Sequence, residues 1–211
     1  NPEFVMAAQK NAEFQRVLQT ADLCIPDGQG LLWATRLRGT HLRQRVPGST
    51  LLWGISKRAA LKGWRLYFLG ASEGVAERAA EIMQATFPGL RVVGTHSGSP
   101  HTSSAPGIIE RVRASKPDVL FVAYGAPQQE LWIDRYREEL VVPLLMGVGG
   151  SLDFVAGAAQ RAPEWVQRLG LEWLHRLIKQ PWRFTRMLTL PSFAWYVLTK
   201  RDAIQKQVTL D

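Results

Sequence analysis

The chain has 211 residues, 46% of them hydrophobic, so it can bury a sizeable core, and general disorder is excluded. Twenty-six lysines and arginines against eighteen acidic residues give a net charge of +8, which favours an anionic partner: a nucleotide, a nucleic acid or an acidic membrane surface. The single cysteine, Cys24, excludes an internal disulfide and fits a reducing compartment, and we expect it to be a small buried apolar residue.

The N-terminal part of the chain is predicted to be mainly helical, with one strand. Apolar residues recur at helical spacing over residues 3–20 with a break near Asn11, which predicts one or two short helices. The stretch "ADLCIPDGQG", residues 21–30, predicts a buried strand that runs into a glycine-containing turn. Helices are expected next at about residues 31–37 and, after a basic loop, at about residues 50–62.

Residues 64–150 alternate regularly between strand and helix patterns, and this alternation is the firmest indication of the fold. The strand pattern at 119–124 is nearly continuously apolar, as expected where helices cover both faces of a parallel sheet. We therefore predict an α/β, Rossmann-like core over residues 1–160, with a mostly parallel sheet flanked by helices. The predicted strands are 64–70, 90–96, 117–125 and 142–150, and the predicted helices are 72–87, 106–116 and 127–140.

The composition changes from residue 161 onward, where nine lysines and arginines face four acidic residues among several tryptophans. We predict a basic, Trp-rich helical C-terminal appendage over residues 161–211. A helix over 164–179 would carry one apolar stripe, most simply explained as core packing. Residues 182–201 mix aromatic, aliphatic and basic side chains as interfacial segments do, and a packed helix or an oligomer contact is the alternative.

Ligands of open parallel sheets bind outside the carboxyl ends of the strands. Glycine-containing turns there aim backbone N–H groups at an anion such as a diphosphate, although each can also be only a tight connection. No metal site is predicted, since the four histidines lack zinc spacing and no Asp-x-Asp pair is present. The loops expected at this edge are 26–30, 70–74, 95–98, 125–130 and 147–153.

Several motifs in order resemble the WecG/TagA/CpsF glycosyltransferases over about residues 1–186. Members transfer N-acetylmannosamine or its uronic acid from a UDP-sugar to polyprenyl-diphosphate-linked N-acetylglucosamine at the inner face of the bacterial membrane. The resemblance implies an inverting, metal-independent enzyme without a cofactor. It rests on "PDGQG", "RVPGSTLL", "YFLGASEGVAERAA", "PDVLFVAYGAPQQELWI" and "GVGGSLDFVAGAAQRAPEWVQRLGLEWLHRLIKQPWR".

Asp27 in "PDGQG" matches the catalytic base proposed for the family, which takes the proton from the acceptor hydroxyl. A carboxylate at a strand end beside apolar Leu23 and Ile25 can be partly desolvated, which suits that task. An Asx turn that fixes the Asp-Gly corner is the alternative.

The resemblance also implies substrate-binding residues. Arg45 matches an arginine near the substrate, and a solvated loop cation is the alternative. Gln129 matches a glutamine that can hydrogen-bond sugar or uracil, while Gln128 stands where relatives often have a cation. Glu130 could be the base instead, or could cap the following helix. Asn1 matches the asparagine of a Thr-x-Asn strand end whose threonine lies upstream.

In the family, the appendage folds over the active site and brings arginines to the UDP diphosphate. By motif these are Arg176, Arg183 and Arg186, although Pro181 argues against one continuous helix. The implied partners are the UDP-sugar, the lipid-linked acceptor and the membrane surface, and a homo-oligomer stays open. No run is apolar enough to span a membrane and no signal peptide precedes the fold, so we expect a cytoplasmic protein, peripheral on the inner face of the membrane.

Two other functions fit the composition less well. A nucleotide-dependent oxidoreductase on the same fold lacks the GxGxxG motif followed by an acidic residue. A nucleic-acid-binding protein is suggested only by the isoelectric point of about 10.1.

Overall fold

The computed structural model describes residues 1–159, 163, 166, 174, 177–178 and 188–199. The chain divides into two compact units. Residues 48–161 form one, here called the sheet unit, and residues 1–47 with 162–211 form the other, here called the terminal unit. The terminal unit joins the appendage to the first residues of the chain, a grouping that the sequence did not predict.

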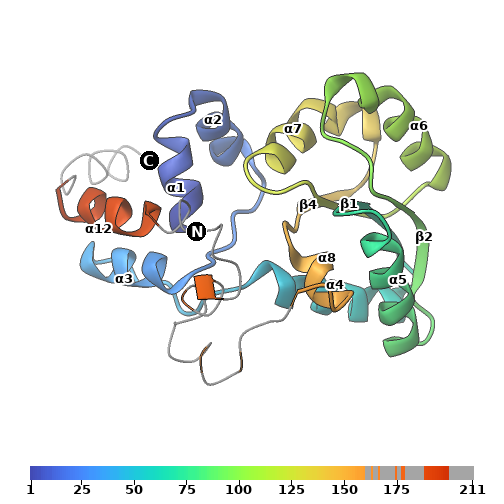
Figure 1. Ribbon diagram of the computed structural model, residues 1–211, viewed down its shortest axis with the longest axis horizontal. Coiled ribbons are helices and arrows are strands. Elements are labelled where there is room, and N and C mark those ends of the chain that lie inside the picture. The colour runs from blue at the N-terminus through green and yellow to red at the C-terminus, as the bar shows by residue number, and fades with distance from the viewer. Residues whose placement is uncertain (160–162, 164–165, 167–173, 175–176, 179–187, 200–211) are drawn as a thin grey trace. The chain divides into compact units, whose positions relative to one another are not determined.

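The sheet unit contains four parallel strands in the order β2-β1-β3-β4 (Figure 1). Phe68 on the second strand in this order pairs with Phe121 on the third, and all but one residue of these two strands are buried. The predicted α/β fold with a parallel sheet is confirmed. The strands are β1 (Arg65–Gly70), β2 (Arg91–His96), β3 (Val119–Ala123) and β4 (Leu144–Gly147).

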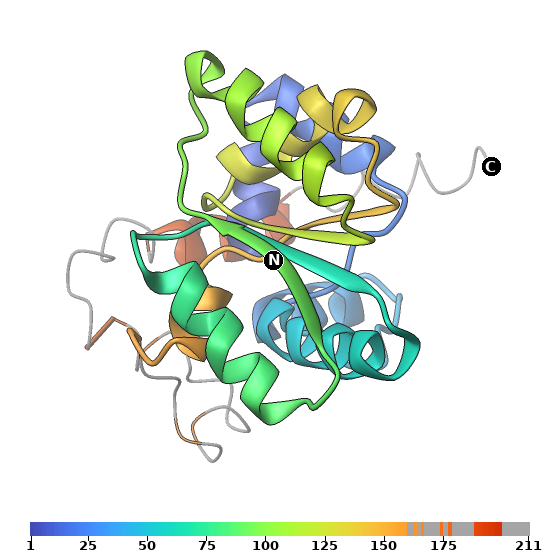
Figure 2. The ribbon, with the colours of Figure 1, turned by 90° about the vertical axis from the view of Figure 1, so that its right-hand side faces the viewer.

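Helices cover both faces of this sheet (Figure 2). Successive strand side chains point to opposite faces, so Leu66 and Phe68 enter one core while Tyr67 and Leu69 enter the other. The first core contains α4 (Gly48–Lys62), α5 (Val75–Thr86) and α8 (Ser151–Val155), and the second contains α6 (Ala105–Ser115) and α7 (Gln128–Leu140). A short 3₁₀ turn, η1, spans Thr102–Ser104.

The terminal unit is helical in its described residues. Asn1 and Asn11 each accept a hydrogen bond from a backbone N–H of the first helical turn, at 3.0 Å, which satisfies a donor that the helix itself leaves free. The predicted break near Asn11 is therefore the N-cap of the second helix. The helices are α1 (Pro2–Ala8), α2 (Ala12–Thr20), α3 (Gln29–Leu37) and α12 (Thr189–Thr199).

Helix α12 packs against α1 and α3, although it lies far from them in the sequence. Its Phe193 and Val197 are buried together with Ala34 of α3. Burial of these side chains ties the end of the described chain to its beginning, which explains why residues 1–47 belong to the same compact unit as the tail.

The buried strand predicted within residues 21–30 is wrong. Residues 21–26 form no strand, and Leu23 is 77% exposed. Cys24 is exposed as well, so its predicted place in the core is also wrong; its thiol donates to the Leu18 carbonyl at 3.3 Å. The short apolar run that suggested a buried strand pairs with none of the four described strands.

The helix predicted over 164–179 lies largely outside the described residues, as does the basic end of the chain after residue 199. Within the part that the structure describes, no helix has the length and apolar character needed to cross a membrane.

Candidate active site

Gln129 fastens two loops together at the carboxyl end of the sheet. Its Oε1 accepts hydrogen bonds from the N–H of Gly125, after β3, at 3.1 Å and from the N–H of Gly149, after β4, at 2.9 Å. The side chain is only 3% exposed. Both acceptor positions of the oxygen are therefore used by backbone donors, and this fixes the orientation of the amide.

Glu130, the next residue, completes this arrangement. Its Oε1 accepts a hydrogen bond from Gln129 Nε2 at 2.6 Å. Its Oε2 is buried and has no hydrogen-bond partner among the described residues. Burial raises the pKa of the Glu130 carboxyl above its ordinary value, and the bond from Gln129 offsets part of that rise. A carboxyl group with a raised pKa beside a strand end can exchange a proton with a ligand.

Gly147, at the end of β4, leaves the room that these two side chains need. A Cβ atom at this position would lie 2.6 Å from Gln129 Nε2 and 2.7 Å from Glu130 Oε1. Any larger residue would push apart the hydrogen-bonded pair, so the glycine in "GVGG" is required by packing and not only by the turn.

The ends of β1 and β3 approach each other in the same closely packed way. A Cβ on Gly70 would lie 2.7 Å from the backbone of Ala123, and Ala71 N–H donates to the Ala123 carbonyl at 3.0 Å. The hydroxyl of Tyr124, just beyond β3, is buried and finds no hydrogen-bond partner in the part of the chain that the structure describes. Burial raises the pKa of this hydroxyl, which keeps it protonated. The sequence reasoning missed Tyr124, because an aromatic residue at the end of an apolar strand is usually a core residue.

Asp27 lies in the terminal unit, on the half-buried loop that leads into α3. Val46 N–H donates to the carbonyl of Pro26 at 2.7 Å, which pairs the backbone next to Asp27 with the backbone next to Arg45. Gly28, with φ of +92°, approaches the first residues of the chain: a Cβ there would lie 3.1 Å from Pro2 Cδ.

The same hypothetical Cβ of Gly28 would lie 3.8 Å from the Cβ of Asn1. Segments containing Asn1, Asp27 and Arg45 are thus neighbours within one unit, although the sequence separates them widely. Arg45 lies in a loop and is half-buried.

Comparison with known proteins identifies the family of this chain. The family described as "Glycosyl transferase WecG/TagA/CpsF family" matches residues 1–207. The chain belongs to this family.

Relatives within the family share about a third of the sequence. A protein of Bacillus spizizenii is 34% identical over 206 residues, which cover 98% of this chain and 79% of the relative. A protein of Bacillus subtilis is 33% identical, covering 94% and 77%, and one of Staphylococcus aureus is 30% identical, covering 98% and 80%. All three are named N-acetylglucosaminyldiphosphoundecaprenol N-acetyl-beta-D-mannosaminyltransferase.

The residues expected from the resemblance fall into three groups. Asn1, Asp27 and Arg45 gather in the terminal unit, and Gln129 and Glu130 are hydrogen-bonded neighbours in the sheet unit. The three tail arginines lie outside the described residues; they are Arg176, Arg183 and Arg186.

No three His, Cys, Asp or Glu side chains are grouped as metal ligands anywhere in the part of the chain that was placed. The sequence shows that position 147 is a glycine. That this glycine leaves room for the Gln129 side chain follows only from the packing.

Proposed function

We propose that the chain is an inverting glycosyltransferase that moves N-acetylmannosamine or its uronic acid from a UDP-sugar to polyprenyl-diphosphate-linked N-acetylglucosamine. The relatives' name supports the sugar and the acceptor, since each is named for transfer of an N-acetylmannosaminyl group to N-acetylglucosaminyldiphosphoundecaprenol. The product would serve the synthesis of a cell-wall polysaccharide or a teichoic acid.

Asp27 is the proposed base. Its carboxylate would take the proton from the acceptor hydroxyl while that oxygen bonds to C1 of the sugar and the C1–O bond to UDP breaks on the opposite face. The observation that carries this proposal is the meeting of three family positions, because the loop of Asp27 pairs with the backbone beside Arg45 and approaches the backbone of Asn1. A positioned base typically contributes a factor of about 10²–10⁴ in rate.

Gln129 is proposed to act mainly through the loops that it joins. Its oxygen is fully used by backbone donors, which leaves one amide hydrogen for a sugar or uracil oxygen. Glu130 is the second candidate for the base, since its buried oxygen and raised pKa suit proton transfer.

The leaving diphosphate carries charge that the protein must stabilise. We propose that Arg176, Arg183 and Arg186 supply cations there, helped by backbone N–H groups, and that no metal ion is needed. Turnover should then survive excess EDTA. Loss of turnover with EDTA that magnesium or manganese restores would contradict this.

The appendage over residues 161–211 is proposed to act both as a lid on the site and as a membrane-association segment. Since a polyprenyl-linked acceptor lies in the bilayer, an enzyme that stays at the inner surface of the cell membrane meets its substrate more often. The net charge of +5 over residues 161–211 would favour anionic lipids.

The test is release of UDP by the purified chain. It should occur with UDP-N-acetylmannosamine or its uronic acid plus a soluble lipid-linked N-acetylglucosamine analogue, and it should stop when the acceptor is left out. Hydride transfer to a nicotinamide nucleotide, or salt-sensitive oligonucleotide binding without UDP release, would favour one of the two alternatives instead.

A further inference from the structure

Helix α12 exposes apolar side chains on the side that faces away from its packing contacts. Its eleven residues include no charged side chain. Phe193 and Val197 are buried, whereas Trp195 is 71% exposed and Leu198 is 65% exposed. A helix that is apolar on all sides is normally buried on all sides, so this outer side is expected to meet a partner.

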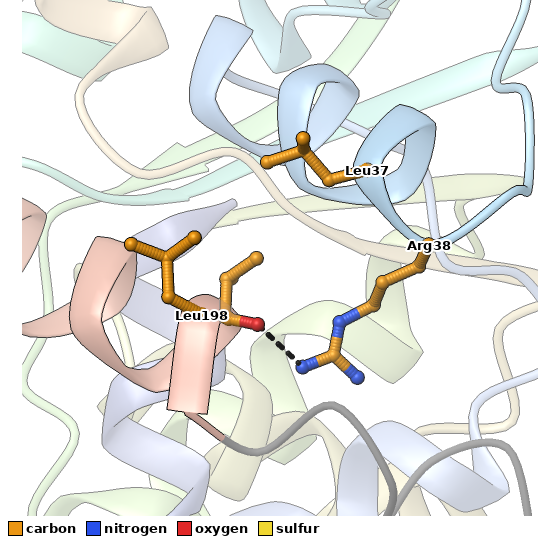
Figure 3. A pocket seen from close by; sticks show the side chains of 4 residues that line it. Leu37, Arg38 and Leu198 are labelled. Atoms are coloured by element: carbon orange, nitrogen blue, oxygen red, sulfur yellow. Dashed lines mark hydrogen bonds between the residues drawn. The ribbon is translucent and has the colours of Figure 1, made fainter.

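Helix α3 exposes a second apolar strip beside it. Trp33 and Leu37 are 57% and 59% exposed and lie four residues apart, on the same side of the helix. Leu37 and Leu198 line one hollow of about 110 Å³ together with Arg38, whose Nη2 donates to the Val197 carbonyl at 3.2 Å (Figure 3). The two strips therefore form one surface, here called the apolar face: Trp33, Leu37, Trp195 and Leu198.

An open groove of about 590 Å³ runs along the other flank of α12. It is lined by Met6, Pro191, Ser192, Trp195, Tyr196 and Thr199, and none of these side chains is charged. Trp195 lines this groove and Leu198 lines the first hollow, so the apolar face is uneven, and a fluid partner could fill both hollows.

The charges of α3 and of the loop that follows it are positive. Residues 28–47, all in the terminal unit, contain no aspartate or glutamate and four arginines. Arg36, between Trp33 and Leu37 in the sequence, and Arg43, in the loop after α3, are both exposed. Exposed tryptophan and leucine beside arginine are the side chains that enter the interface of an anionic bilayer, where the ring sits at headgroup level and the cation meets lipid phosphates.

We propose that the apolar face, with Arg36 and Arg43, rests on an anionic phospholipid bilayer, with Trp33, Leu37, Trp195 and Leu198 entering the interface. Helix α3 is then a membrane-contacting element in addition to the basic tail. This inference rests on the proposed function in one respect: a lipid-linked acceptor lies in the membrane and would explain why the enzyme binds there. The surface itself follows from exposure and charge.

The experiment measures sedimentation of the full chain with vesicles of phosphatidylglycerol and phosphatidylcholine, and with vesicles of phosphatidylcholine alone. The double variant Trp33→Ser, Leu37→Ser should bind the anionic vesicles at least tenfold more weakly. The control is Leu61→Ser, Val141→Ser, which removes two side chains of similar exposure, 75% and 73%, from the sheet unit. It should bind as the unchanged chain does.

A second pair of variants tests the charges. Arg36→Gln, Arg43→Gln should weaken binding to the anionic vesicles by about fivefold for each arginine, with little effect on phosphatidylcholine vesicles. Lys57→Gln, Arg58→Gln removes two exposed cations of α4 and serves as the matched control. All four residues are exposed, so each protein should keep its melting temperature.

The outcomes separate this inference from the proposed function. If the Trp33 and Leu37 variant binds vesicles normally, or if both control variants lose as much binding as their counterparts, the inference is wrong. A change from dimer to monomer in sedimentation velocity, with vesicle binding unchanged, would also overturn it and assign the apolar face to a second copy of the chain. If the vesicle results are as expected and the chain releases no UDP, the proposed function fails while the membrane surface stands.

Discussion

The two regions that contain the proposed site residues hold them in different ways. In the sheet unit, Gln129 is almost fully buried and its amide is fixed by backbone N–H groups from two loops. In the terminal unit, Asp27 lies on a half-buried loop preceded by exposed Leu23 and Cys24. A residue that holds the scaffold together should affect folding and turnover together, whereas a reactive residue on a loop should affect turnover alone.

The largest effect is expected at Asp27. Asp27→Asn should lower kcat by about a hundredfold or more while the melting temperature and UDP-sugar binding change little, because asparagine keeps the size of the side chain but cannot accept a proton. UDP release and a thermal melt measure the two quantities. Asp22→Asn, an exposed carboxylate in the same segment, is the control and should be fully active. Near-normal turnover of Asp27→Asn would leave Glu130 as the base.

Gln129 should show the opposite pattern, with stability affected first. Gln129→Leu leaves the N–H groups of Gly125 and Gly149 without their acceptor, which should lower the free energy of unfolding by about 2–4 kcal/mol. Denaturant unfolding measures this loss. Gln128→Leu, at the exposed neighbouring position, should change stability by about 0.5 kcal/mol or less. Equal stability of the two variants would mean that the loops do not depend on the Gln129 amide.

Gly147→Ala tests the packing around Gln129 by adding a single methyl group. The added Cβ would overlap the Gln129 and Glu130 side chains, and we expect a loss of about 1–3 kcal/mol in unfolding free energy, with lower kcat because the pair is displaced. Gly150→Ala is the matched control, since its Cβ would meet Asp153 Oδ2 at an ordinary 3.5 Å. A Gly147 variant as stable and active as the Gly150 variant would contradict the tight packing described here.

The smallest effect is a pH dependence at Glu130. At pH values below the ordinary pKa of 4.5, the Glu130 carboxyl is protonated in both the folded and the unfolded chain, so its titration does not change the free energy of unfolding. Above that pH the unfolded chain ionises first, because burial raises the pKa in the folded state, so the stability of the unchanged protein falls as the pH rises through the window between the two pKa values.

Glu130→Gln lacks this titration and keeps an acceptor for Gln129 Nε2. Its melting temperature relative to the unchanged chain should therefore rise between pH 4 and pH 8. A difference in melting temperature that stays constant over this range would show that Glu130 titrates alike in both states. The same variant should retain most of its turnover if Asp27 is the base.

The alternation of strand and helix patterns over residues 64–150 predicted the sheet unit well. Apolar strands such as Val119–Ala123 can be stable only between two helical layers, and each helix between them carries its own periodic signal. The family resemblance identified Asp27, Arg45 and Gln129 as positions of interest, but it assigned no contacts to them.

Contacts between distant segments were decided only by the tertiary structure. The run "LCI" has the composition of a buried strand, yet it pairs with none of the described strands, and a local pattern cannot report which segments will lie beside it. The two hydrogen bonds that Gln129 Oε1 accepts come from loops that follow two different strands, at positions 4 and 20 residues away in the sequence. Over residues 64–150 the sequence by itself determined which segments form helices and strands, because periodicity is local, whereas burial, hydrogen-bond partners and the pKa of Glu130 depend on which segments meet.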